Sequence, residues 1–236
     1  MKSKTERRPG AIDRRLLLCK RLPASMAVLA RGMALGCLII LLAASDSFSQ
    51  SQTIVDEWTT VQAPKPPELK PATMDPKTTA LLVLDFVKQT CNAERRPRCL
   101  TSVPKVESLL NLARSKGVPV IHSITTAATP ADIAKELAPR DGEPIVKTSA
   151  DKFFKTDLEK ILTEKGIKAA VVVGTAAQGA VLNTASQAAF RGLQVIVPVD
   201  GLSAENTYFE QYTAYHLGNA PGVGQQTTLT KIEMIK

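Results

Sequence analysis

The stretch TALLVLDF, residues 79–86, is an unbroken apolar run that ends in an acid and a phenylalanine. Such a run is typical of a strand that is buried on both faces of a sheet. Similar runs follow as VPVIHS (118–123), AAVVVG (169–174) and QVIVPVDG (194–201), with PIV (144–146) and residues 226–229 as shorter candidates. The chain therefore returns to strand-like sequence several times.

Helical patterns separate these runs. One helix face is marked by four apolar residues with helical spacing, namely Val106, Leu109, Leu110 and Ala113. Thr156 and Glu159 form a capping box that begins a second helix, and two more are predicted near 179–191 and 206–217. Alternating buried strands and helices predict an α/β fold, a doubly wound parallel sheet with helices on both faces.

Charge is distributed unevenly along the 236 residues. The first 50 residues hold nine Lys/Arg and three Asp/Glu, a net charge of +6, which leaves only +2 for the remainder. The total of +8 is therefore mainly a property of the leader, and no nucleic-acid-binding surface is indicated. With 44% hydrophobic residues, the chain is not of the disordered class.

The leader, residues 1–49, is predicted to be a signal peptide. Its apolar run, Met33 to Ala44, has twelve residues, whereas a membrane span needs about 20. Small residues at 47–49 place cleavage near Gln50, which predicts a periplasmic or secreted protein. The alternative is an uncleaved anchor, because residues 28–44 are apolar apart from Arg31 and the glycines.

The segment after the leader, residues 50–76, contains five prolines and little periodicity. It is predicted to be an extended arm or linker, and residues 77–236 to be the folded domain. Beyond the leader, the cysteines are Cys91 and Cys99, which bracket a polar segment predicted to be a loop. In an oxidising compartment a disulfide between them is expected. The alternative is that one of them is a catalytic thiol.

Three strand ends carry residues suited to chemistry. Asp85 follows the first strand, Lys147 follows the short third one, and the turn GTAAQGAVLNTA (174–185) follows the fourth. Each residue taken alone has a structural explanation: an acid at a strand end can cap a helix, and a lysine can simply be exposed to solvent. Ligands of doubly wound sheets bind at the carboxyl ends of the strands, so together these features predict one site.

These motifs resemble the isochorismatase-like hydrolase superfamily, the cysteine hydrolase family, over residues 79–229. The matches are the strand that ends in Asp85, a lysine six residues before Phe153, and a strand, glycine and turn followed by Thr-Ala at 184–185. The resemblance implies that Asp85 and Lys147 are catalytic. By position, the family's nucleophilic cysteine corresponds to Ala180.

An alanine at that position changes the chemistry that the resemblance implies. A methyl group cannot attack a carbonyl, which excludes amide hydrolysis by the covalent route. The isochorismatases proper also have a small residue there and an alanine corresponding to Ala177. Their reaction, vinyl-ether hydrolysis, would need Asp85 as general acid and Lys147 as electrostatic partner. The alternative is a catalytically inactive pseudoenzyme or binding module that keeps the pocket.

The resemblance also implies how a small-molecule substrate binds, with Ala176, Ala177 and Phe153 beside it. Val87 stands where the family usually has glutamine, and Ala176 stands where the isochorismatases have an aromatic residue. These departures leave the substrate unidentified.

No metal and no cofactor is predicted, because the two histidines, His122 and His216, are isolated in the sequence. Of the partner classes, a small-molecule substrate is expected, whereas nucleic acid and a stable membrane span after cleavage are not. A homo-oligomer is left open.

Overall fold

The computed structural model describes residues 53–236, and the chain divides into two compact units, residues 1–62 and 63–236. The predicted leader lies outside the described residues. Within the first unit, α2 (Ile54–Glu57) is a single turn, and the Asp56 carboxylate accepts hydrogen bonds from the Thr53 N–H and hydroxyl. In the part of the chain that is described, no helix is long and apolar enough to cross a membrane.

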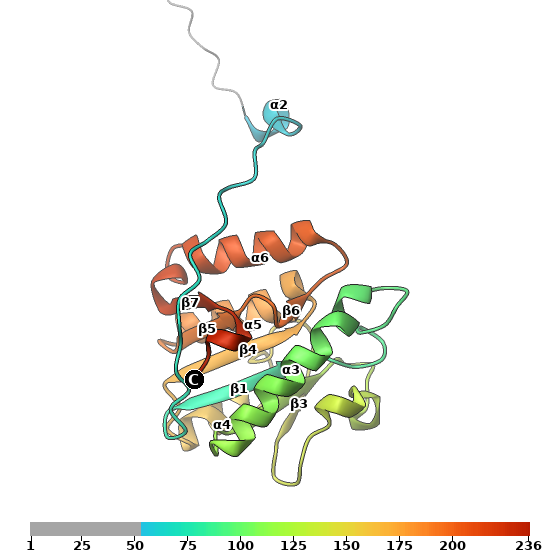
Figure 1. Ribbon diagram of the computed structural model, residues 1–236, viewed down its shortest axis with the longest axis vertical. Coiled ribbons are helices and arrows are strands. Elements are labelled where there is room, and N and C mark those ends of the chain that lie inside the picture. Colours follow the sequence, from blue (N-terminus) through green and yellow to red (C-terminus); the bar gives the residue numbers. More distant parts are fainter. Residues whose placement is uncertain (1–52) are drawn as a thin grey trace, which may run out of the picture. The chain divides into compact units, whose positions relative to one another are not determined.

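The second unit is built on one parallel sheet (Figure 1). Its strands are β1 (Thr79–Leu84), β2 (Val120–Ile124), β3 (Ile145–Lys147), β4 (Ala169–Thr175), β5 (Gln194–Pro198), β6 (Leu202–Ser203) and β7 (Thr227–Thr230). Their order is β3-β2-β1-β4-β5-β7, with β6 beside β4, and every pair is parallel. The predicted fold class is confirmed.

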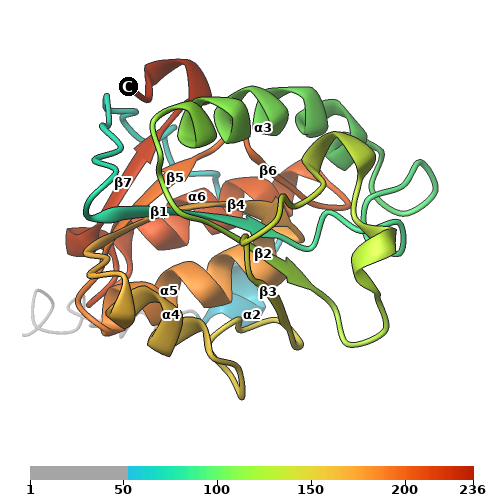
Figure 2. The same ribbon diagram turned by 90° about the horizontal axis from the view of Figure 1, so that it is seen from below.

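Helices cover both faces of this sheet. They are α3 (Pro97–Ser115), α4 (Leu158–Glu164), α5 (Leu182–Phe190) and α6 (Thr207–Asn219), with 3₁₀ turns at Pro130–Asp132, Lys135–Leu137, Gly224–Gln226 and Ile232–Met234 and a π-helical turn at Ala177–Val181. Figure 2 shows α3 on one side of the sheet and α4 and α5 on the other.

The alternation of side chains along β1 explains the two layers. Leu82 and Leu84 pack into the core shared with α4, α5 and α6, whereas Leu81 and Val83 pack against α3. Because successive residues of a strand point to opposite faces, an all-apolar strand supplies both cores. Each leucine that is fully buried contributes about 1.5–3 kcal/mol relative to an exposed one.

Two helix starts differ from the sequence-based expectation. The segment predicted to be a loop ends inside α3, which begins at Pro97, because proline is well suited to the first turn of a helix. At α4, the Thr156 hydroxyl does accept the Leu158 N–H at 3.2 Å. The other half of the predicted capping box is absent, because the Glu159 carboxylate binds Arg191 instead.

The proline-rich segment leads into the sheet along the C-terminal residues of the same unit. The Lys70 N–H donates to Leu229 O at 2.9 Å, and the Met74 N–H donates to Lys236 O at 2.8 Å. Met74 is buried in the α3-side core. From residue 70 onward, this segment is therefore part of the folded unit.

A glycine brings β1 and β4 together where they end. A Cβ atom at Gly174 would lie 2.6 Å from the Leu84 Cβ and 2.7 Å from the Leu84 carbonyl oxygen. Such distances do not occur between real atoms, so only glycine fits here. The close approach places Asp85, the next residue of the first segment, beside the turn that follows β4.

Candidate active site

Asp85 lies at the carboxyl end of β1 in an unusual backbone conformation. Its φ is +57°, in the left-handed region that residues other than glycine rarely adopt. Its carbonyl oxygen accepts hydrogen bonds from the Val87 N–H at 2.8 Å and from the Thr90 hydroxyl. The residue is only 4% exposed, and its Oδ1 accepts a hydrogen bond from Ser123 on β2 at 2.8 Å. The turn therefore holds the carboxyl group at a defined place.

The cation beside Asp85 is Lys152, not the predicted Lys147. The Lys152 Nζ lies 2.7 Å from Asp85 Oδ2, and the side chain is fully buried. The same nitrogen donates to the carbonyl oxygens of Ser149 at 2.6 Å and Thr148 at 3.4 Å. Three acceptors match the three donors of an ammonium group, so Lys152 is positioned as a charged partner.

Lys147 occupies a different environment. It is exposed at the end of edge strand β3 and lines a surface cavity together with Lys155 and Asp157. Val146, the residue before it, points into the core, and neighbours in a strand point to opposite faces. The spacing of six residues before Phe153 indicates Lys147 as the catalytic lysine. Spacing alone does not reveal that the loop after β3 turns Lys152 inward.

The surroundings of Asp85 act on its pKa in opposite directions. Burial is the largest effect and raises the pKa above its usual value. The Lys152 charge and hydrogen bond, the Ser123 hydroxyl and the Arg96 charge each lower it. Burial prevails, so the pKa lies above its usual value, the direction that suits a proton donor.

The turn after β4 begins with Ala176 and contains Ala180. The Thr175–Ala176 peptide bond is cis, and the Ala176 carbonyl oxygen accepts the N–H groups of Gly179 at 3.0 Å and Val181 at 3.3 Å. A π-helical turn at Ala177–Val181 continues directly into α5. Ala180 is 4% exposed, so it lies under the surface of this turn.

A threonine on α5 links the lysine loop to this turn. The Lys152 N–H donates to Thr184 Oγ1 at 3.2 Å, and the Thr184 hydroxyl donates to Ala150 O at 3.4 Å. Thr184 is four residues after Ala180. The loop that supplies Lys152 thus packs against the first turn of α5, just after the π-helical turn that contains Ala180.

Phe153 is not placed beside this site. Its side chain belongs to the core, and its ring lies 4.3 Å from the Arg191 guanidinium. That guanidinium donates to the Gln187 carbonyl oxygen, roughly 10 Å along the helix from Ala180. Phe153 therefore packs in the core beside Arg191, and its implied contact with substrate stays a prediction. Ala177 is also fully enclosed in the core.

A known protein family shares these features. Residues 79–229 match the family model described as the isochorismatase domain.

The chain belongs to the isochorismatase family of hydrolases.

Two curated relatives have similar sequences. The secreted isochorismatase effector Isc1 of Verticillium dahliae is 32% identical over 144 residues, which cover 56% of this chain and 76% of that protein. N-carbamoylsarcosine amidase of an Arthrobacter species is 29% identical over 159 residues, which cover 56% of this chain and 60% of the amidase. The matched region thus spans less than two thirds of the amidase.

Solved structures of the family share the fold. An isochorismatase from Pseudomonas putida superposes with a TM-score of 0.62 at 17% identity, covering 72% of this chain and 94% of the other. N-carbamoylsarcosine amidase from Thermoplasma acidophilum superposes with a TM-score of 0.57 at 20% identity. The superposition covers 66% of this chain and 97% of the amidase.

A polar network at the rim of this isochorismatase-family site has no sequence signal. The Arg96 Nε donates to Glu205 Oε1 at 2.9 Å, and the Gln178 Nε2 donates to Glu205 Oε2 at 3.0 Å. Burial acts to raise the pKa of Glu205, but the hydrogen bonds from Arg96 and Gln178 outweigh it and hold the pKa at about 2. The pairing joins residues 109 apart in the chain, so no local pattern predicts it.

The histidines of this family member lie apart from Asp85 and from each other. His122 is buried on β2, where its Nε2 lies 3.0 Å from Glu143 Oε2, and Arg114 also binds Glu143. Burial lowers the pKa of His122. The His216 ring packs at a tilt against the Tyr212 ring of α6, with the ring centroids 5.9 Å apart. Within residues 53–236, no three His, Cys, Asp or Glu side chains are grouped as a metal site.

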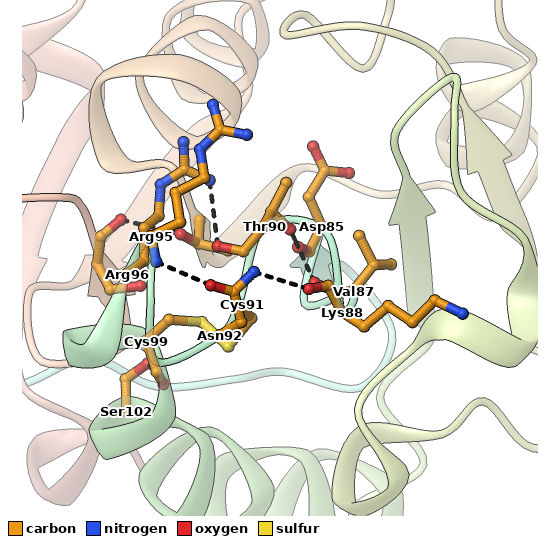
Figure 3. Close-up of a disulfide and its surroundings, with 12 residues drawn as sticks. Asp85, Val87, Lys88, Thr90, Cys91, Asn92, Arg95, Arg96, Cys99 and Ser102 are labelled. Carbon is orange, nitrogen blue, oxygen red and sulfur yellow. Dashed lines mark hydrogen bonds between the residues drawn. A yellow bond between two sulfur atoms is a disulfide. The ribbon is translucent and has the colours of Figure 1, made fainter.

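Cys91 and Cys99 form a disulfide with a Cα–Cα distance of 5.3 Å (Figure 3). Replacing both cysteines by serine is expected to lower the free energy of unfolding by about 2–3 kcal/mol, because the cross-link restricts the unfolded chain. Urea denaturation without reductant measures this effect, and reduced wild-type protein should match the variant. Alkylation of both thiols in non-reduced exported protein would contradict the prediction.

Proposed function

We propose that this protein is an exported hydrolase that cleaves a small molecule without a covalent enzyme intermediate. Vinyl-ether hydrolysis fits its site best, with Asp85 as general acid and Lys152 as electrostatic partner. The observation that carries the proposal is the buried Asp85–Lys152 pair, with Nζ 2.7 Å from Oδ2. Lys152 takes the role that the sequence spacing suggested for Lys147.

The proposed reaction has three steps. Asp85 transfers a proton to the enol carbon, and water adds to the oxocarbenium ion that forms while its proton returns to the Asp85 carboxylate. The resulting hemiketal then breaks its C–O bond and releases an alcohol and a carbonyl product. The raised pKa of Asp85 makes proton donation possible at a higher pH than for an ordinary aspartate. Lys152 stabilises the carboxylate that proton transfer leaves behind, because its ammonium remains beside it in a buried environment.

Residue 180 supports the non-covalent route. Ala180 corresponds to the position of the family's nucleophilic cysteine, and a methyl group cannot form an acyl intermediate. The N–H groups of Ala176 and Ala180 correspond by position to the family's oxyanion hole.

The alternative, an inactive binding module, is less well supported. Burying a charged pair is costly unless the geometry is good, and a site without chemistry has no need for both charges. The residues around the pair satisfy it closely, with Ser123 on Asp85 and Ser149 on Lys152.

Export is proposed from two observations. The leader combines basic residues with a twelve-residue apolar run, and one relative is described as a secreted effector. We propose a periplasmic or secreted protein, with an uncleaved membrane anchor as the alternative.

A substrate screen with variants tests this function. Purified protein should hydrolyse members of a panel of vinyl ethers and leave amides intact. Asp85→Asn should lower kcat by about 10²–10⁴-fold, the contribution typical of a general acid. Lys152→Met should also lose most activity, whereas Lys147→Met should retain it. Amide hydrolysis by the wild type, or vinyl-ether hydrolysis insensitive to Asp85→Asn, would refute the proposed mechanism.

A further inference from the structure

We propose that Arg96 is a positioning residue for Asp85 and that the Cys91–Cys99 disulfide holds Arg96 in place. The proposal extends the proposed function, because it takes Asp85 as the reacting acid. Arg96 makes no hydrogen bond to the Asp85 carboxyl group, so it acts on Asp85 through its charge and through the residues that it binds.

The Arg96 guanidinium first reaches the loop that carries Asp85. Its Nη1 donates to the Thr90 carbonyl oxygen at 3.2 Å, and the Thr90 hydroxyl donates to the Asp85 carbonyl oxygen. Thr90 thus connects the guanidinium with the residue whose backbone is in the left-handed conformation. Figure 3 shows Asp85, Thr90 and Arg96 near one another beside the disulfide.

The same guanidinium also reaches the turn that contains Ala180. Its Nε and Nη2 donate to Glu205 Oε1 at 2.9 and 2.5 Å, and Gln178 donates to the other oxygen of Glu205. Gln178 lies within the π-helical turn, two residues before Ala180. One buried cation therefore joins the loops that follow β1, β4 and β6.

The disulfide encloses Arg96 within a short ring of chain. The Arg96 N–H donates to Asn92 O and the Cys99 N–H donates to Arg96 O, both at 2.9 Å. Arg96 is only 5% exposed although it carries a charge. Reduction would free the ends of this ring, and the buried guanidinium would lose the constraint that sets its direction.

Arg98, which lies in the first turn of α3, provides a matched control for Arg96. It also binds a carboxylate with two donors, Nε and Nη2 to Glu210 at 2.8 and 2.6 Å. Its side chain is 48% exposed, and none of its hydrogen bonds involves Thr90 or Asp85. Replacing Arg98 removes an equivalent ion pair without touching the chain of contacts to Asp85.

Titration of the Asp85 carboxyl group reports on this arrangement without any substrate. The groups that face Asp85 are Lys152 from the loop after β3, Ser123 from β2 and Arg96 from the disulfide loop. Loss of the Arg96 charge removes one influence that favours the ionised form. The pKa of Asp85 should therefore rise in Arg96→Gln.

The experiment measures carboxyl ¹³C shifts against pH in the full chain, with Asp85→Asn to assign the signal. Arg96→Gln should raise the pKa of Asp85, Arg96→Lys should restore part of the difference, and Arg98→Gln should leave it unchanged. Cys91→Ser/Cys99→Ser should raise it as well and add little in the Arg96→Gln background. Reduced wild-type protein should behave in the same way, which provides the test if Arg96→Gln fails to fold.

Activity provides the second readout. Arg96→Gln should lower kcat about 10- to 100-fold with little change in KM, as expected when a reacting group is misplaced by about 1 Å. An unchanged Asp85 titration in Arg96→Gln, or an equal change in Arg98→Gln, would overturn the positioning role. If Asp85→Asn retains full activity, the proposed function fails, and the titration still decides whether Arg96 positions Asp85.

Discussion

Lys152→Met is expected to lower the free energy of unfolding by about 3–5 kcal/mol at pH 7, the typical cost of breaking a buried ion pair. The substitution leaves Asp85 buried with one fewer compensating charge, and the carbonyl oxygens of Ser149 and Thr148 lose the Nζ that satisfies them. Methionine has a similar length, so little of the loss in stability comes from a cavity. Urea denaturation monitored by circular dichroism measures the change in the free energy of unfolding.

Two variants isolate the cause of that loss. Lys147→Met removes an exposed lysine five residues earlier and should change stability by less than about 0.5 kcal/mol, as surface substitutions do. Asp85→Asn combined with Lys152→Met should recover much of the loss, because no unpaired charge remains buried. A large effect of Lys147→Met, or no recovery in the double variant, would contradict the pairing.

The loss in Lys152→Met should also depend on pH. The pKa of Asp85 is raised in the folded protein, and without Lys152 it rises further. Between the unfolded and folded pKa values the folded state binds more protons, so lowering the pH stabilises it. The free energy of unfolding of Lys152→Met should therefore fall less far below that of the wild type at pH 5 than at pH 7. A deficit that grows toward pH 5 would exclude a buried unpaired carboxylate as its origin.

The sheet was predictable because its strands are buried on both faces. Between Ala80 and Leu84 no polar residue indicates a solvent face, and the structure buries all six residues of β1. The short β6 was not predicted, because Leu202–Ser203 has only two residues and its pairing with β4 depends on the tertiary fold. Local sequence therefore determined the long elements and missed the short one.

The site was predictable only in part, for a related reason. Asp85 could be located because strand ends of a parallel sheet meet at one edge. Lys152 could not be distinguished from Lys147, because both precede Phe153. The path of the loop between β3 and α4 is set by contacts with α5, including the bond to Thr184. Arg96 and Glu205 meet only after folding, so their pairing required the structure.

Ala180→Cys is expected to create a thiol that iodoacetamide alkylates at least tenfold faster at pH 7 than an ordinary buried cysteine. The residue lies in the turn that begins α5, where the N-terminal end of the helix favours negative charge. We expect the ammonium of Lys152 to act in the same direction, because the Lys152 N–H binds Thr184, four residues after Ala180. An ordinary thiol has a pKa of about 8.5 and is only slightly ionised at pH 7.

Ser186→Cys provides the matched control for this thiol. It lies farther along α5, and its hydroxyl oxygen is also buried, so the reagent meets a similar barrier without the helix end. Peptide-level mass spectrometry of the full chain separates the thiol introduced at position 180 or 186 from Cys91 and Cys99, which the disulfide protects. Equal alkylation rates at the two positions would show that the turn does not stabilise negative charge.

Second substitutions then identify the charges that tune this thiol. In the Ala180→Cys background, Lys152→Met should slow alkylation at pH 7, because it removes the cation that favours the thiolate. Asp85→Asn should accelerate it, because any ionised Asp85 opposes a second negative charge nearby. Lys147→Met should leave the rate unchanged. If Lys147→Met slows alkylation and Lys152→Met does not, the cation of the site in solution is Lys147, and the assignment of Lys152 fails.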